Sequence, residues 1–124
     1  DPLKVVGICV RRLADQQSSR VFKYCQDINK LAGFPSAVTE EDVIVSDDYL
    51  GPGYGQSTPE MMEAITLAGR KEGLLLDPVY TGKVLAGLIG LVRNRTFIAG
   101  DNVVFLHTGG TPALFGYRDL FNNI

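Results

Sequence analysis

The sequence predicts an α/β domain of three layers, in which a mostly parallel sheet lies between helices. Short apolar runs rich in β-branched residues alternate with longer segments of helical spacing, and this alternation is typical of parallel sheets. Glycine and proline separate the segments, as expected for turns. The 124 residues suffice for about one domain, and the 45% hydrophobic content allows one sizeable core.

Three segments are predicted to be strands of the sheet. Lys4–Val10 (KVVGICV), Asp42–Asp47 (DVIVSD) and Asn102–His107 (NVVFLH) are short and mostly apolar. Runs of this length and composition are typical of buried parallel strands.

Two helices are predicted in the first half of the chain. The first runs from about Ser18 to Ala32, with Ser18 or Ser19 as its cap and Gly33 as its stop. The second begins at Thr58–Pro59, a capping residue followed by a proline at the first turn, and it ends at Gly73.

The second half predicts two more helices, from Thr81 to about Arg93 and from Ala113 to Phe121. The helix from Thr81 contains three glycines, each of which costs about 1 kcal/mol relative to alanine, so we expect it to pack tightly against another backbone. Its predicted apolar face consists of Val84, Leu85, Leu88, Leu91 and Val92.

The composition excludes several classes of protein. Twelve basic and 14 acidic residues give a net charge of −2, which argues against a nucleic-acid partner. No apolar run approaches the roughly 18 residues of a membrane helix, so we expect no membrane partner. Cys9 and Cys25 lie in apolar segments and are expected to be inert buried thiols. A single histidine and acidic residues placed in loops give no metal site, so we expect none.

Three loops are expected to meet where the strands end at their carboxyl edge, which is where α/β sheets bind ligands. They are Asp47–Thr58, Asp77–Thr81 and Thr108–Pro112. Tyr54 and Tyr80 lie in the first two and have flat rings that suit a flat ligand.

Each candidate residue also has a plain structural interpretation. Tyr54 fits an exposed turn as well as a cleft, and Thr81 is favoured as a helix cap. The TGGT sequence from Thr108 fits a tight turn better than an anion site. We expect His107 to be structural and Lys83 to be a solvated surface lysine.

Three stretches together resemble a known family. They are Ser46–Gly55 (SDDYLGPGYG), Glu72–Gly90 (EGLLLDPVYTGKVLAGLIG) and Val104–Phe115 (VFLHTGGTPALF). The chain resembles the carboxyl-terminal third of the D-cysteine desulfhydrase and 1-aminocyclopropane-1-carboxylate deaminase family, which are pyridoxal-phosphate enzymes of the tryptophan-synthase-β-like fold. The resemblance implies that residues 1–124 are the carboxyl-terminal portion of the large cofactor-binding domain of a longer enzyme.

The resemblance also implies roles for four residues. Tyr54 is expected to reach the substrate and move a proton, and Tyr80 to stack on the pyridine ring of the cofactor. Thr81 and Thr108 are expected to contact the cofactor, one of them at the pyridine nitrogen. In the deaminases a glutamate stands at the position of Thr81 and a leucine at that of Thr108.

With threonine at these two positions, the resemblance implies α,β-elimination of D-cysteine to sulfide, ammonia and pyruvate. A carboxylate at the pyridine nitrogen would make the ring a strong electron sink, whereas a neutral hydroxyl supports a weaker one. Thiolate is a good leaving group and needs less help than a cyclopropane ring. The alternatives are the 1-aminocyclopropane-1-carboxylate deaminase itself and a non-catalytic binding module of the same fold.

The Schiff-base lysine of the family has no counterpart in this chain. We therefore expect the 124 residues alone to be inactive. By resemblance, the parent enzyme is expected to be a cytoplasmic homodimer that acts on a small amino acid. Self-association of the chain through an uncovered sheet edge is a further possibility.

Overall fold

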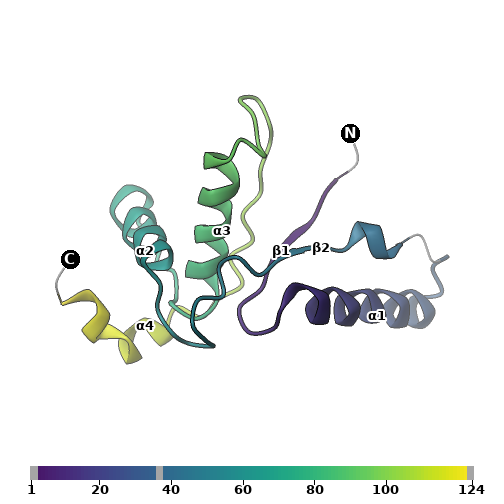
Figure 1. Cartoon of the computed structure of the whole chain (residues 1–124), viewed down its shortest axis with the longest axis horizontal. Coiled ribbons are helices and arrows are strands. Elements are labelled where there is room, and N and C mark those ends of the chain that lie inside the picture. Colours follow the sequence, from purple (N-terminus) through teal and green to yellow (C-terminus); the bar gives the residue numbers. More distant parts are fainter. Residues whose placement is uncertain (1–2, 36–37, 123–124) are drawn as a thin grey trace.

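A computed structural model describes residues 3–35 and 38–122 of the chain. These residues form an α/β structure in which helices pack around a short parallel sheet (Figure 1). The elements are, in chain order, β1 (Val6–Ile8), α1 (Ala14–Ala32), a 3₁₀ turn (Glu40–Asp42), β2 (Ile44–Ser46), α2 (Pro59–Glu72), α3 (Thr81–Arg93), α4 (Ala113–Gly116) and a second 3₁₀ turn (Arg118–Phe121).

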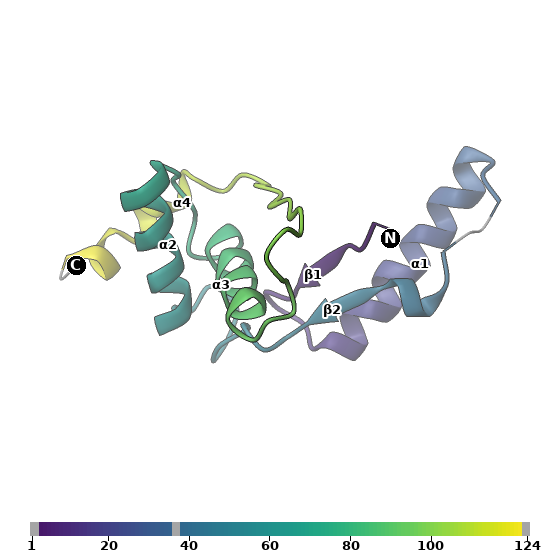
Figure 2. The ribbon, with the colours of Figure 1, turned by 90° about the horizontal axis from the view of Figure 1, so that it is seen from above.

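The sheet consists of β1 and β2, which pair in parallel with Val6 opposite Ile44 and Ile8 opposite Ser46. The crossover between these strands contains α1, which lies at one end of the molecule (Figures 1 and 2). Helix α3 lies between α2 and the sheet, where it packs against α2 and also contacts β1 (Figure 1). Both strands are shorter than the sequence predicted, but their parallel pairing agrees with the prediction.

Helix α1 begins four residues earlier than predicted, and neither serine caps it. The hydroxyls of Ser18 and Ser19 instead donate within the helix to the carbonyl of Asp15, each at 3.0 Å. The carboxylate of Asp47, which follows β2, accepts a hydrogen bond from the Ala14 N–H at 2.8 Å. Asp47 is therefore a capping group for α1.

Helix α2 has the ends that the sequence predicts. The hydroxyl of Thr58 accepts a hydrogen bond from the N–H of Met61 at 3.2 Å, and Pro59 occupies the first turn. The helix ends at Gly73, which adopts the left-handed conformation. Its buried residues are Met61, Ala64, Ile65 and Ala68.

Helix α3 has the predicted bounds, but the predicted apolar face was wrong. The buried residues are Thr81, Gly82, Lys83, Ala86 and Gly87. Four residues of the predicted face, Val84, Leu85, Leu88 and Leu91, are only partly buried, and the fifth, Val92, is 53% exposed. Small residues form the buried face because neighbours approach closely there: a Cβ at Gly87 would lie 2.6 Å from Ile8, and one at Gly90 would collide with Tyr49. Among the three glycines of α3, Gly82 differs because a Cβ there would lie close to a backbone atom, the carbonyl oxygen of Asp77.

The core cluster joins α2 to the segment before α3. Met61, Ile65, Ala68 and Leu76 form its buried centre. Half-buried side chains pack around it, namely Met62, Leu85, Phe105, Leu114 and Phe121. The cluster therefore ties the carboxyl-terminal segment to α2.

Two predictions about the second half of the chain were wrong. The run Asn102–His107 is not a strand, because no neighbouring strand pairs with it among the described residues; Val104 and Leu106 are 87% and 73% exposed. The final helix is broken at Tyr117 into α4 and a 3₁₀ turn. Within the described residues, no helix combines the length and the apolar character needed to cross a membrane.

Candidate functional site

The structure brings the two predicted tyrosines into contact. Tyr54 lies in the loop between β2 and α2, and Tyr80 lies immediately before the first residue of α3. Their hydroxyl groups form a hydrogen bond, and their ring centroids are 6.0 Å apart with an interplanar angle of 66°. The two residues are 50% and 42% exposed, so the pair presents aromatic surface and phenol groups to solvent.

The surroundings of the pair change the acidity of Tyr80. The hydrogen bond with Tyr54 raises the pKa of Tyr80, and burial and the charge of Asp77 act in the same direction. The guanidinium of Arg11, which lies 5.7 Å from the centroid of the Tyr54 ring, partly opposes this increase. The raised pKa makes the Tyr80 phenol a weaker acid than an ordinary tyrosine. Sequence reasoning missed Arg11, because it lies in an irregular segment far from both tyrosines in the chain.

Asp77 is fully buried and organises the backbone before α3. Its carboxylate accepts hydrogen bonds from the N–H groups of Val79, Tyr80 and Thr81 at 2.8–2.9 Å, and from the Thr81 hydroxyl at 2.7 Å. Burial alone would raise the pKa of Asp77, but the hydrogen bonds from Thr81, Tyr80 and Val79 outweigh it and the pKa is lowered. Asp77 thus fixes the position of Tyr80.

Thr81 is fully buried and its hydroxyl is engaged with Asp77. The hydroxyl donates to the carboxylate at 2.7 Å and accepts from the Asp77 N–H at 2.9 Å. The expected contact between Thr81 and a pyridine nitrogen stays a prediction. The capping role that we assigned to Thr81 belongs to the Asp77 side chain. An acidic residue shortly before a helix is a recognisable capping signal, and it could have identified Asp77 from the sequence.

The third predicted loop packs against the segment before Asp77. The Nε2 atom of His107 is 3.2 Å from the Leu75 carbonyl, to which the Thr111 hydroxyl also donates at 3.1 Å. The Gly109 N–H donates to Nδ1 of His107 at 3.1 Å. His107 is therefore structural, and the TGGT sequence is a turn whose Gly109 N–H is already used. Thr108 is exposed on this turn.

Gly110 and Gly109 offer a matched test of this packing. Both have positive φ angles, 90° and 99°, but a Cβ at Gly110 would lie 2.7 Å from the Asp77 carboxyl group, whereas one at Gly109 would contact nothing within 4 Å. We expect Gly109→Ala to cost about 1–3 kcal/mol of backbone strain. Gly110→Ala should cost distinctly more, because it also displaces Asp77. Urea unfolding followed by circular dichroism measures both, and equal losses would contradict the packing of Gly110 on Asp77.

Lys83 contradicts the expectation of a solvated surface lysine. Its side chain has no exposed area, and its Nζ atom lies 2.5 Å from the Leu50 carbonyl oxygen and 3.3 Å from that of Gly53. These carbonyls belong to the loop that carries Tyr54. A lysine in the first turn of a glycine-rich apolar helix was the available signal, because cations are disfavoured at that end of a helix.

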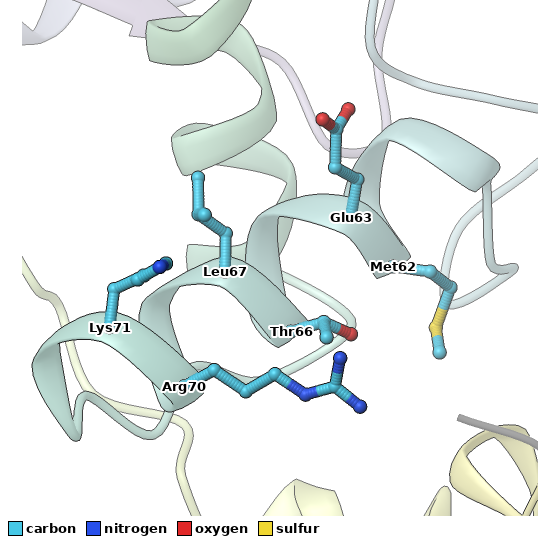
Figure 3. Close-up of a pocket in the computed structure, with 6 residues that line it drawn as sticks. All are labelled: Met62, Glu63, Thr66, Leu67, Arg70 and Lys71. Atoms are coloured by element: carbon cyan, nitrogen blue, oxygen red, sulfur yellow. The ribbon is translucent and has the colours of Figure 1, made fainter.

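A shallow hollow on α2 lies apart from these loops (Figure 3). Its lining comes from one helix and consists of Met62, Glu63, Thr66, Leu67, Arg70 and Lys71. The carboxylate of Glu63 is engaged by the guanidinium of Arg93 at 2.5 and 2.9 Å. Because the hollow has neither the tyrosines nor the glycine turn, it is not the candidate site. Among the described residues, no group of acidic, histidine or cysteine side chains could hold a metal ion.

The fold and the site define an α/β protein with a candidate ligand site formed by the loop after β2 and the segment before α3. Residues 2–109 match the family model described as pyridoxal-phosphate dependent enzyme. The chain belongs to this family, whose cofactor is pyridoxal phosphate. Of the residues named for the site, Tyr54, Tyr80, Thr81 and Thr108 lie within the matched range.

Similar proteins include deaminases from bacteria and yeast. The chain is 39% identical over 120 residues to the 1-aminocyclopropane-1-carboxylate deaminase of Ralstonia pickettii, covering 97% of this chain and 36% of the relative. It is 40% identical over 119 residues to the probable 1-aminocyclopropane-1-carboxylate deaminase of Schizosaccharomyces pombe, covering 96% of this chain and 35% of the relative. The chain thus spans about one third of the length of these relatives.

A solved structure confirms the fold class. The crystal structure titled as that of an ACC deaminase homologue matches with a TM-score of 0.84 and 33% sequence identity. The match covers 98% of this chain and 35% of that chain. The predicted fold, part of a tryptophan-synthase-β-like enzyme, is therefore confirmed.

Proposed function

We propose that the chain is part of a pyridoxal-phosphate enzyme that releases ammonia from a small amino acid. The observation that carries this proposal is the Tyr54–Tyr80 pair, which presents two phenols and two ring surfaces to solvent. As a carboxyl-terminal portion of the cofactor domain, the chain supplies one wall of the site. The coverage of about one third of each relative supports this view.

The residues of this wall fit the cofactor. The half-exposed ring of Tyr80 offers a flat surface for stacking against a pyridine ring. The exposed Thr108 and the backbone of the glycine turn would border the cofactor from the third loop. When bound, pyridoxal phosphate withdraws electrons from the α-carbon of the substrate. Lys83 is buried and bonded to two carbonyls, so it is unsuited to be the covalent anchor.

We infer that Tyr54 is the group that moves a proton. Tyr54 is half-exposed, and its hydroxyl shares a hydrogen bond with the hydroxyl of Tyr80. Tyr80 thereby orients the Tyr54 oxygen while its own ring is available for the cofactor. A positioned phenol of this kind is a general acid–base group.

Two substrates are candidates, and different observations favour them. The names of the relatives favour 1-aminocyclopropane-1-carboxylate, which makes deamination the better supported reading. By resemblance, a threonine at position 81, where the deaminases carry a glutamate, favours D-cysteine, because a weaker electron sink suits a substrate with a good leaving group. Arg11 and the tyrosine pair do not distinguish between these two substrates.

The test uses the whole reading frame that encodes this segment, expressed with pyridoxal phosphate. D-Cysteine and 1-aminocyclopropane-1-carboxylate are offered separately, and ammonia and the 2-oxo acid are measured. We expect ammonia from at least one of them: 2-oxobutyrate supports the deaminase, and sulfide with pyruvate supports the desulfhydrase. Absence of ammonia from both would refute the enzymatic proposal and favour a binding module of the same fold. Sizing chromatography with light scattering tests the proposed homodimer, and the 124-residue chain, assayed in parallel, should be inactive.

A further inference from the structure

Lys83 connects the start of α3 to the loop that carries Tyr54. Its ammonium group donates to the carbonyl oxygen of Leu50 at 2.5 Å and to that of Gly53 at 3.3 Å. Gly53 immediately precedes Tyr54, and Lys83 is three residues after Tyr80. One buried side chain thus bridges the two segments that supply the phenols.

This arrangement is costly for a lysine. The side chain has no exposed area, and burial lowers its pKa. Within the described residues no carboxylate forms a salt bridge with Lys83. The positive charge also lies in the first turn of α3, where the helix dipole disfavours a cation. An apolar residue would avoid these costs, so the contact with the two carbonyls is what a lysine adds at this position.

The Tyr54 loop also contacts the rest of the molecule through Tyr49, which lies against Gly90 of α3, and through Arg11, which lies over the Tyr54 ring, but neither contact is a hydrogen bond. Its backbone hydrogen bonds are short-range turns, from the Leu50 N–H to the Asp47 carbonyl at 3.1 Å and from the Gln56 N–H to the Gly53 carbonyl at 3.2 Å. Besides Lys83, the Tyr54 hydroxyl bond to Tyr80 links this loop to the start of α3. The ammonium therefore holds the backbone next to Tyr54 at a set distance from α3.

We propose that Lys83 is a positioning residue. It holds the Leu50–Gly53 turn against α3, so that the hydrogen bond between the Tyr54 and Tyr80 hydroxyl groups is maintained. Its effect on the tyrosine pair is a property of this chain alone. Its effect on catalysis rests on the proposed function.

The direct test follows the Tyr80 phenol by NMR. The chain is labelled at the tyrosine ζ carbon, the signal of Tyr80 is assigned with Y80F, and the pH is raised through the phenol titration. The wild-type pKa of Tyr80 should lie above its ordinary value of 10.0. The hydrogen bond with Tyr54 and the charge of Asp77 raise this pKa, and the charge of Arg11 lowers it by less. K83M should lower the pKa of Tyr80 toward 10.0, because the hydrogen bond between the Tyr54 and Tyr80 hydroxyls is lost. K71M, which removes an exposed lysine of α2, should leave it unchanged.

An unchanged, raised pKa of Tyr80 in a folded K83M chain would overturn the proposal. K83R, which keeps the donors, should preserve more of the increase than K83M does. If K83M fails to fold, competitive acetylation of the wild-type lysines decides instead. Lys83 should react at least about ten-fold more slowly than Lys71, as expected for a buried and bonded amine, and equal rates would overturn the proposal.

The catalytic consequence is measured separately in the enzyme of the whole reading frame. K83M should lower kcat at least about ten-fold with little change in KM, since a misplaced proton-transfer group slows the chemical step. K71M is again the control. A wild-type enzyme without activity would refute the proposed function, and the Tyr80 titration would still decide the role of Lys83.

Discussion

Replacing Asp77 by alanine is expected to lower the free energy of unfolding by at least about 3 kcal/mol, because several buried N–H groups and the Thr81 hydroxyl lose their acceptor at once. That loss is a large part of the 5–15 kcal/mol that typically stabilises a domain. D77N keeps the shape without the charge and should lose less. Urea unfolding followed by circular dichroism measures the change.

Asp27→Ala is the matched control, since Asp27 is exposed on α1. It should change the unfolding free energy by less than about 0.5 kcal/mol, as is usual for surface positions. If D77A behaved like this control, the carboxylate would not be the group that organises the start of α3.

The stabilisation by Asp77 should depend on pH in a defined direction. Its pKa is lower in the folded chain than the ordinary value of 3.8, so its contribution is fully present above pH 3.8 and is lost as the pH falls through the lowered folded value. D77N should lack this part of the acid sensitivity. Asp42, bonded by Thr39, and Glu63, bonded by Arg93, also have lowered pKa values and give a slope that both proteins share.

Replacing Tyr54 by phenylalanine is expected to reduce turnover by about 10²–10⁴-fold in the enzyme of the whole reading frame. The change removes one oxygen and leaves the ring, so stacking and folding should persist while the proton-moving group is lost. KM should change only a few-fold. Steady-state rates of ammonia release on the accepted substrate measure the effect.

Y24F provides a control with the same chemical change. Tyr24 lies on α1, where its hydroxyl accepts a hydrogen bond from Arg20 at 2.9 Å. It should retain full turnover. If Y54F kept more than a tenth of the wild-type kcat, Tyr54 would not be the proton-moving group.

The sequence by itself determined the features that depend on local chemistry. The ends of α2 followed from Thr58, Pro59 and Gly73, because capping and helix termination involve neighbours in the chain. The motif around Tyr80 also indicated the family, which the comparisons confirmed. The sequence placed Tyr54 and Tyr80 in loops that were expected to meet, and the structure brings them together, although the segment before Tyr80 follows α2 and not a strand.

The tertiary structure decided what depends on partners far away in the chain. Lys83 is buried because the Leu50–Gly53 turn, about 30 residues earlier, offers carbonyl oxygens to its ammonium. Asn102–His107 has strand composition but no strand, since strand formation requires a hydrogen-bonded neighbour. Apart from Lys83, the buried face of α3 consists of small residues, because close neighbours leave no room for larger ones. Composition describes what each segment can do, and the contacts made on folding select among those possibilities.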